Sequence, residues 1–210
     1  MHNHKLTGLY AITDAAQNDP QQLVADVEQA LLGGARIIQY RDKTTQHDQR
    51  YDTARRLRKL TRQHNVLFII NDDTALASDS HADGVHLGRD DLPISAARAQ
   101  LDPTAIIGVS CYNDFSLAKQ AVNDGADYIA FGRFFPSYTK PDAPQASIET
   151  LQMAKRELDI PVAAIGGITI ENAATLIHAG ADMLAIVNAV FSQTDIKAAA
   201  QHYQKCFGKK

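Results

Sequence analysis

Three polar side chains at alternate positions, Gln39, Arg41 and Lys43, are the first feature of this sequence that could do chemistry. They follow a short apolar run that is typical of a buried strand. Alternate side chains of a strand point to the same side, so these three should share one face, with Tyr40 and Asp42 on the other. Because a buried charge persists only when another group compensates it, an amide beside two cations predicts an anion site. A solvated strand end is the alternative.

Two acidic clusters follow other apolar segments, at Asn71-Asp72-Asp73 and at Arg89-Asp90-Asp91. Carboxylates from separate strands can share Mg²⁺, a hard cation that prefers oxygen ligands and usually keeps positions for substrate phosphate. We therefore infer a metal-bridged phosphate or diphosphate held by Asp72 and Asp91. The alternative for each carboxylate is to cap the helix that follows it. Their combination with the cationic set favours the metal.

Two further segments carry features of a binding site. The stretch from Gly132 to Pro144 holds hydroxyls and a cation, and it is long for a strand-to-helix connection, which is typical of a lid or binding loop. A floppy insertion is the alternative. Gly166-Gly167 and Val187-Asn188 predict a second anion site, because backbone N–H groups can approach a phosphate where glycine leaves room. A tight turn would also explain the glycines.

Other residue types that often do chemistry are less informative here. His86 lies inside an apolar strand and is expected to be a packed or hydrogen-bonded core histidine. Cys111 and Cys206 are the only cysteines and lie far apart, so neither a disulfide framework nor a Cys-based zinc site is expected. Cys111 follows Ser110, a probable site residue, but it has no neighbouring histidine and is expected to be a small packing residue.

The elements that must position these residues recur as a unit of strand, helix and glycine stop. In the first unit, residues 8–13 form the strand, Asp19 caps the helix with Pro20 at its first position, Gln22 caps reciprocally, and Gly33 ends it. Similar junctions precede alternate strands at Gly33-Gly34-Ala35, Ala82-Asp83-Gly84, Gly125-Ala126-Asp127 and Gly180-Ala181-Asp182. Further helices are expected over 48–64, 73–80, 93–100, 114–124, 147–157, 171–179 and 195–207.

Eight such alternations in 210 residues leave roughly 26 residues per unit, near the lower limit for a (β/α)₈ barrel. We therefore predict an α/β fold, a compact TIM barrel formed as a single domain by residues 1–210. The near-continuous apolar strands support a parallel sheet covered by helices. An open doubly wound sheet is the alternative, but the first strand is followed by no Gly-rich fingerprint. The carboxyl ends of barrel strands, where the polar residues above lie, usually form the active site.

The net charge of −3 gives no general attraction to nucleic acid or to an anionic membrane, so the expected partners are small phosphorylated molecules. The polar start, residues 1–5, leads into a strand-like segment without an apolar signal region, and no run is long enough to span a bilayer. A cytoplasmic protein is therefore expected. The oligomeric state stays open.

Seven motifs occur in order at the predicted strand ends. They are LYAITD, Q-x-R-x-K at 39–43, NDD at 71–73, ADGVHLG followed by Asp91, GVS at Ser110, the FP-S-x-TKP loop and IGGI, with the end of the eighth strand in addition. Together they make almost the whole chain resemble the thiamine phosphate synthase family. The resemblance implies a (β/α)₈ transferase that joins 4-amino-5-hydroxymethyl-2-methylpyrimidine diphosphate to a thiazole phosphate and releases pyrophosphate.

The resemblance also implies roles for individual residues. The family reaction is thought to be dissociative: pyrophosphate leaves first, and the thiazole nitrogen captures a pyrimidine-methyl cation. Arg41, Lys43, Ser110 and Lys140 would be catalytic. The pyrimidine diphosphate would be held by Gln39, Tyr40, Arg41, Asp42, Lys43, Asn71, Ser110 and Lys140, Mg²⁺ by Asp72 and Asp91, and the thiazole phosphate by Ser137, Tyr138, Thr139, Gly167, Val187 and Asn188. Within the first set, the opposite-facing Tyr40 and Asp42 are expected to be structural.

Four positions depart from the commonest family pattern. Arg89 stands where Gln is frequent, Tyr112 where His often occurs, Ser137 where Thr is usual and Asn188 where Ser is frequent. These changes bear on fine substrate contacts rather than on the reaction. Two alternatives are a thiazole tautomerase, which typically lacks the acidic pair and the TK loop, and a non-catalytic phosphometabolite-binding barrel, which needs no metal pair beside several cations.

Overall fold

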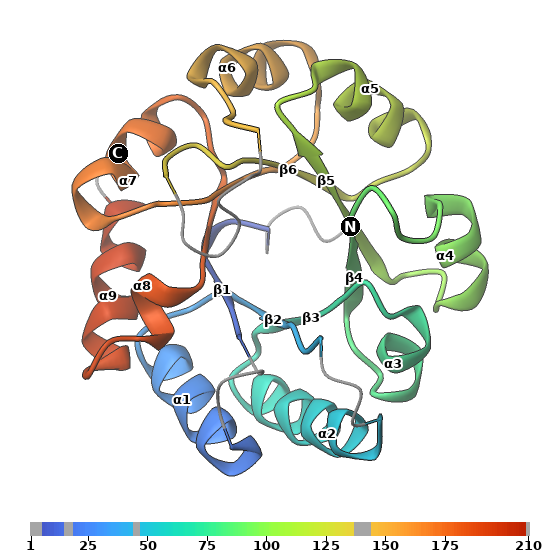
Figure 1. Ribbon diagram of the computed structural model, residues 1–210, viewed down its shortest axis with the longest axis vertical. Coiled ribbons are helices and arrows are strands. Elements are labelled where there is room, and N and C mark those ends of the chain that lie inside the picture. Colours follow the sequence, from blue (N-terminus) through green and yellow to red (C-terminus); the bar gives the residue numbers. More distant parts are fainter. Residues whose placement is uncertain (1–5, 15–18, 44–46, 137–143, 209–210) are drawn as a thin grey trace.

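The computed structural model describes residues 6–14, 19–43, 47–136 and 144–208. In this part of the chain, parallel strands close into a barrel in the order β1 to β8, and β8 pairs with β1 (Figure 1). Helices surround the barrel, as Figure 1 shows, so the predicted (β/α)₈ TIM barrel is confirmed and the open doubly wound sheet is wrong. The strands are β1 Gly8–Ile12, β2 Ile37–Tyr40, β3 Leu67–Asn71, β4 Gly84–Leu87, β5 Ile106–Tyr112, β6 Tyr128–Phe131, β7 Val162–Ile165 and β8 Met183–Ile186.

The helices begin and end within a residue or two of the predicted bounds, because their capping residues could be recognised. Asp19 accepts hydrogen bonds from the N–H groups of Gln21 and Gln22, as an N-cap should. The predicted reciprocal cap is wrong, since the Gln22 side chain donates to Asp26 at 2.8 Å instead. The helices are α1 Pro20–Leu32, α2 His47–Gln63, α3 Thr74–Asp79, α4 Ile94–Gln100, α5 Phe115–Asn123, α6 Ile148–Glu157, α7 Ile170–His178, α8 Asn188–Phe191 and α9 Ile196–Cys206.

The short helix α8, Asn188–Phe191, was not expected from the sequence. Its four residues are too few to show a helical period, and no side chain caps its first turn. It places Val187 and Asn188 at a junction between strand and helix rather than at a plain strand end.

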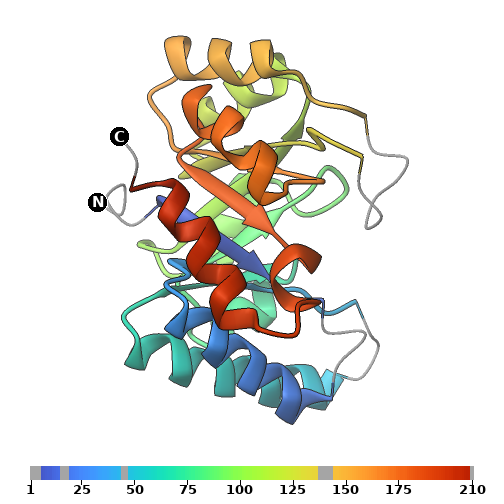
Figure 2. The same ribbon diagram turned by 90° about the vertical axis from the view of Figure 1, so that its left-hand side faces the viewer.

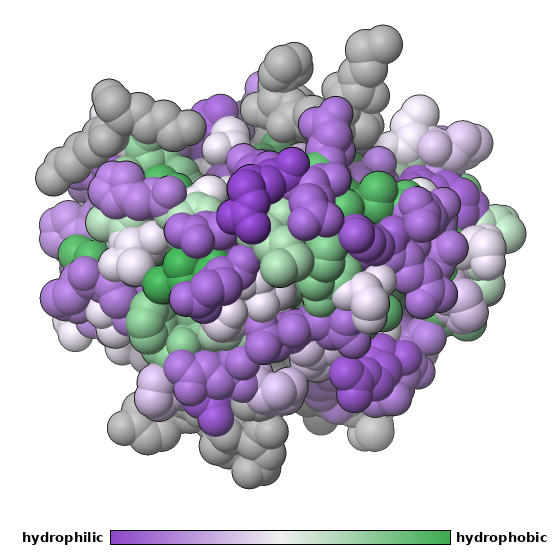
Figure 3. All heavy atoms as spheres, turned by 90° about the horizontal axis from the view of Figure 1, so that it is seen from above, coloured by the Kyte–Doolittle hydropathy of each residue, from purple (hydrophilic) through white to green (hydrophobic). Residues whose placement is uncertain are grey.

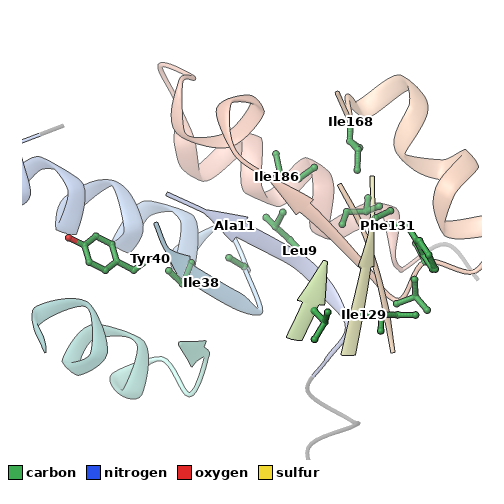
Figure 4. Close-up of a cluster of buried hydrophobic side chains, with 14 of the residues drawn as sticks. Leu9, Ala11, Ile38, Tyr40, Ile129, Phe131, Ile168 and Ile186 are labelled. Atoms are coloured by element: carbon green, nitrogen blue, oxygen red, sulfur yellow. The ribbon is translucent and has the colours of Figure 1, made fainter. Parts of the chain in front are cut away.

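Strand side chains alternate between two separate cores. Residues such as Tyr10, Ile37 and Tyr128 fill the barrel interior, whereas Ile38 and Ile129 pack outside it against the helices. Figure 4 shows part of the outer core, with side chains from β1, β2, β6 and β8 directed away from the barrel interior. This alternation decides which residues of each strand can reach the site at the barrel mouth.

Cys111 belongs to the outer core and is fully buried. Burial, with a smaller contribution from the charge of Asp114, raises the pKa of its thiol to about 12. A neutral thiol in an apolar setting fits the predicted packing role.

The strand direction defines one end of the barrel as the carboxyl end. Figure 2 shows β1 and β8 running side by side toward it. Hydrophilic side chains cover most of the face drawn in Figure 3, and the hydrophobic areas on it are small and separate. Among the described helices, none is both long and apolar enough to cross a membrane.

Candidate active site

A cavity of about 380 Å³ opens at the carboxyl ends of the strands. Residues from every strand or the loop behind it line the cavity, so the predicted strand-end residues meet at one place. The expected site residues that line it are Gln39, Arg41, Lys43, Asn71, Asp72, Asp91, Ser110, Gly167, Val187 and Asn188.

The end of β2 shows the predicted alternation. Gln39, Arg41 and Lys43 line the cavity, and Gln39 is almost completely buried. Tyr40 points into the outer core, and its hydroxyl donates to Asp42 at 2.9 Å. Burial and the Asp42 carboxylate raise the pKa of Tyr40, so it stays a neutral donor. Neither Tyr40 nor Asp42 lines the cavity, which fits the structural role expected of them, and their contact with the diphosphate stays a prediction.

Both cations at the end of β2 rest against carboxylates. Arg41 Nη1 lies 3.7 Å from Asp14 Oδ1, and Lys43 Nζ forms an ion pair with Asp72. The backbone N–H of Arg41 donates to Thr13 Oγ1 at 3.1 Å, which ties the end of β2 to that of β1. The Lys43 side chain is more than half exposed, so its ion pair with Asp72 should be weak and easily exchanged for contacts with a ligand.

Asp72 and Asp91 both line the cavity, and each carboxyl group shifts the pKa of the other. Burial raises the pKa of Asp72, but hydrogen bonds from Lys43 and Asp91 outweigh burial and lower it. Burial and the neighbouring Asp72 raise the pKa of Asp91, although the N–H of Gly88, 2.6 Å from Asp91 Oδ2, opposes this. The two groups thus behave as a like-charge pair in which one proton is favoured.

The helix-cap alternative for these carboxylates is wrong. Asp73 caps α3 by accepting from the N–H of Leu76 at 2.9 Å, and Pro93 is the N-cap residue of α4. Asp72 instead has a positive φ of 63°, an unusual backbone conformation for a residue other than glycine. Unusual backbone geometry of this kind is common at ligand sites.

The paired carboxylates fit a magnesium ion better than a metal that is bound by protein ligands alone. Within the described ranges, no group of three His, Cys, Asp or Glu side chains is placed to hold a metal. Mg²⁺ is usually held by one or two carboxylates together with substrate phosphates and water. A divalent cation would also offset the charge of Asp72, which adds to burial in raising the pKa of Asp91.

Ser110 contacts His86 in the cavity wall. Ser110 Oγ lies 2.9 Å from His86 Nε2, and His86 Nδ1 lies 2.9 Å from the hydroxyl of Tyr128. The prediction that His86 is hydrogen-bonded is therefore confirmed, but His86 also lines the cavity, which its position in an apolar strand did not indicate.

The glycines after β7 have backbone reasons to be glycine. Gly166 and Gly167 have φ values of 98° and 63°. A Cβ on Gly167 would lie 2.3 Å from the carbonyl oxygen of Pro136. The tight-turn explanation therefore holds, and the phosphate contact of Gly167 stays a prediction beside it.

Four expected site residues, Ser137, Tyr138, Thr139 and Lys140, lie outside the described residues. The described start of the same loop runs along the end of β7: the N–H groups of Phe134 and Phe135 donate to the carbonyls of Ile165 and Gly166 at 3.1 Å each. Gly132 and Arg133 line the cavity, so the loop leaves the barrel at its edge.

Other contacts in the cavity carry no signal in the sequence. The guanidinium group of Arg89 stacks on the ring of Tyr112, with the guanidinium carbon 4.6 Å from the ring centroid. The backbone N–H of Arg89 donates to the Tyr112 hydroxyl at 3.3 Å. Two of the four departures from the family pattern therefore contact each other. Tyr10 also lines the cavity. Tyr10 lies in an apolar strand, as core aromatic residues usually do, so nothing in the neighbouring sequence marks it as a cavity residue.

A closed parallel barrel with cations, carboxylates and glycines at the carboxyl ends of its strands defines a (β/α)₈ barrel protein with a charged site at the barrel mouth. More specifically, residues 9–190 match the family model described as thiamine monophosphate synthase. The chain belongs to this family.

Relatives that are named for this activity align along nearly the whole chain. The thiamine-phosphate synthase of Alcanivorax borkumensis is 51% identical over 207 residues, which cover 97% of this chain and 95% of the relative. That of Methylobacillus flagellatus is 50% identical over 202 residues, with 96% of each chain covered. The solved thiamine phosphate pyrophosphorylase from Pyrococcus furiosus has a TM-score of 0.89 at 36% identity and covers 98% of this chain and 97% of its own.

Proposed function

We propose that the chain condenses 4-amino-5-hydroxymethyl-2-methylpyrimidine diphosphate with a thiazole phosphate to give thiamine phosphate and pyrophosphate. The observation that carries this proposal is the convergence of Arg41 and Lys43 with the Asp72–Asp91 pair on one cavity. Family membership and the activity named for the relatives support the same function. The acidic pair argues against the tautomerase and the non-catalytic barrel.

The pyrimidine diphosphate lies, in this proposal, along the β2 side of the cavity. Gln39 and Asn71 contact the pyrimidine end, and Arg41, Lys43 and Lys140 contact the diphosphate. Asp72 and Asp91 hold Mg²⁺, which supplies positive charge to the diphosphate oxygens when it is bound. Lys43, which pairs with Asp72, would exchange that contact for a phosphate oxygen.

The thiazole phosphate lies on the opposite side, against Gly167, Val187 and Asn188, with Ser137, Tyr138 and Thr139 of the loop after β6. Backbone N–H groups after β7 and β8 are the usual phosphate site of this fold. The two ligands would then lie next to each other in the cavity, with the reacting carbon and nitrogen between them.

A dissociative reaction suits this set of residues. The bond between the pyrimidine methylene carbon and the diphosphate oxygen breaks, and the electron pair leaves with pyrophosphate. The thiazole nitrogen then donates its pair to the carbon. The protein needs only to orient both ligands, exclude water and stabilise the charge that grows on pyrophosphate. The preorganised cations can stabilise that charge.

The direct test is to incubate the purified protein with both substrates and MgCl₂ and to separate the products chromatographically. The proposal expects thiamine phosphate. An isomerised thiazole without thiamine phosphate would favour the tautomerase, and no chemical change to either substrate would favour a binding protein.

A further inference from the structure

A continuous chain of hydrogen bonds crosses the barrel beneath the cavity. Gln39 Nε2 donates to the Tyr10 hydroxyl at 2.6 Å, and the hydroxyls of Tyr10 and Tyr128 are 2.7 Å apart. The Tyr128 hydroxyl is 2.9 Å from His86 Nδ1, and His86 Nε2 is 2.9 Å from Ser110 Oγ. Five side chains from five different strands are joined in this way.

Tyr128 is the one member of this hydrogen-bond chain that no ligand can reach. It is fully buried and is not part of the cavity lining, whereas the other four members are. Gly108 on β5 leaves the space for its ring, since a Cβ there would lie 2.0 Å from Tyr128 Cζ. The ring also stacks on His86, with centroids 5.5 Å apart and an interplanar angle of 28°. Tyr128 is therefore held rigidly between Tyr10 and His86.

The direction of every proton in this hydrogen-bond chain follows from its first member and from burial. An amide nitrogen can only donate, so the Tyr10 oxygen accepts from Gln39. If Tyr10 also accepted from Tyr128, its own proton would be buried without a partner, so the Tyr10 proton points to Tyr128. Tyr128 then donates to His86 Nδ1, which must be unprotonated. Burial raises the pKa of both phenols, so each keeps its single proton.

His86 in this arrangement carries its proton on Nε2 and donates it to Ser110 Oγ. The hydroxyl proton of Ser110 is then not donated to His86, and Ser110 can donate it to a ligand in the cavity. If the hydrogen bonds ran in the opposite direction, the Ser110 proton would point toward His86, and His86 would be a base, as in a serine nucleophile pair. The direction thus decides whether Ser110 donates to a ligand or is activated for attack.

We propose that Tyr128 is a positioning residue, which acts through the Nε2–H tautomer of His86 to present Ser110 as a hydrogen-bond donor to the bound ligand. The identification of that ligand as the pyrimidine diphosphate rests on the proposed function. The donor role agrees with a reaction that requires no protein nucleophile.

The first test measures the histidine tautomer in the ligand-free protein by two-dimensional ¹H–¹⁵N NMR of the imidazole nitrogens, with His86→Gln used to assign the signals. The wild-type protein should show the Nε2–H tautomer, and Tyr128→Phe should shift His86 toward the Nδ1–H form or a mixture. A wild-type Nδ1–H tautomer would overturn the proposal. This measurement uses no substrate, so its result does not depend on the proposed function. A failure of the proposed function would show separately, as an absence of turnover.

The second test is a double-mutant cycle on turnover. Tyr128→Phe should lower kcat/KM for the pyrimidine diphosphate about tenfold, the size expected of one well-placed hydrogen bond. In the Ser110→Ala background the same change should have almost no further effect, because the two residues act in series. Losses that add fully, or wild-type kinetics in Tyr128→Phe, would refute the inference.

The matched control is Tyr203→Phe. Tyr203 is also a buried phenol, and its hydroxyl donates to the carbonyl of Ile168 at 3.1 Å, but it lies on α9 outside the cavity lining. Both variants lose one buried hydroxyl, so their melting temperatures should fall to a similar extent. Only Tyr128→Phe should change the tautomer of His86. A change in the His86 signals of Tyr203→Phe would show that a general loss of stability, and not the hydrogen-bond chain, controls the tautomer of His86.

Discussion

Asp72 and Asp91, which follow two neighbouring strands, line the mouth of the barrel together, and each carboxyl group shifts the pKa of the other. Burial raises the pKa of Asp91, and the Asp72 carboxylate raises it further, because two carboxyl groups this close repel each other when both are ionised. A like-charge pair of this kind costs stability in the absence of a cation, so its presence beside Arg41 and Lys43 indicates a function in binding.

Replacing Asp72 by Asn should remove most of the magnesium-dependent activity. The amide keeps the size of the side chain but loses the charge that holds the ion and pairs with Lys43. We expect kcat/KM to fall on the order of 100-fold or more, with the circular dichroism spectrum of a folded protein. Asp26→Asn, on the exposed face of α1, is the control and should retain wild-type rates. Near-normal rates in Asp72→Asn would remove Asp72 from the site.

Lys140→Ala should also abolish most turnover while the protein stays folded. Lys140 lies outside the described residues, so this prediction rests on the family resemblance and on the described start of its loop at the cavity edge. Circular dichroism should be unchanged, and kcat should fall more than the affinity for the thiazole phosphate. Wild-type turnover would show that the loop cation has no part in catalysis.

Asp91→Asn should raise the melting temperature of the metal-free protein at pH 7 while it lowers activity. The folded-state pKa of Asp91 is raised, so its ionisation disfavours the folded state. The penalty appears as pH rises above the ordinary aspartate pKa, about 3.9, and disappears below it. The difference between variant and wild type should therefore be absent at the acidic end of a pH series. A variant less stable than wild type at pH 7 would contradict the repulsion.

Added MgCl₂ should reverse this order of stability. An ion that binds only the folded protein raises its melting temperature by mass action, and it should do so for the wild type more than for Asp91→Asn. Equal stabilisation of both proteins would argue that Mg²⁺ does not bind at this pair.

Gly167→Ala and Gly125→Ala separate backbone strain from crowding at the site. Both glycines have positive φ, 63° and 90°, which costs a residue with a Cβ about 1 to 2 kcal/mol. A Cβ at Gly125 would meet no atom within 4 Å, whereas at Gly167 it would meet the backbone of Pro136 and Phe135. Chemical denaturation should show the larger loss for Gly167→Ala, and only this variant should raise KM for the thiazole phosphate. Similar KM values in both would remove Gly167 from that subsite.

The barrel and most of its mouth could be predicted from the sequence because both rest on local patterns. The glycine junctions repeat with each unit, and the change from apolar to polar marks each strand end, as it does at Gln39, Arg41 and Lys43. The alternation of a strand was enough to separate these residues from Tyr40 and Asp42.

The hydrogen-bond chain beneath the site could not be predicted because it depends on contacts between distant strands. Tyr10 and Tyr128 are 118 residues apart, and each lies among apolar neighbours, where an aromatic residue of either core looks the same. The small helix α8 was missed because its four residues make little more than one helical turn, too few for the periodic pattern that reveals helices.

The central claim, that this cavity joins the two substrates, is tested most directly by the ratio of products. Purified protein should be incubated with both substrates and MgCl₂, and thiamine phosphate and pyrophosphate measured in the same samples over time, with chelator and with Asp72→Asn in parallel. The account predicts that both products appear in equal amounts and that chelator and the variant suppress them together. Release of pyrophosphate without thiamine phosphate, or no release at all, would contradict it.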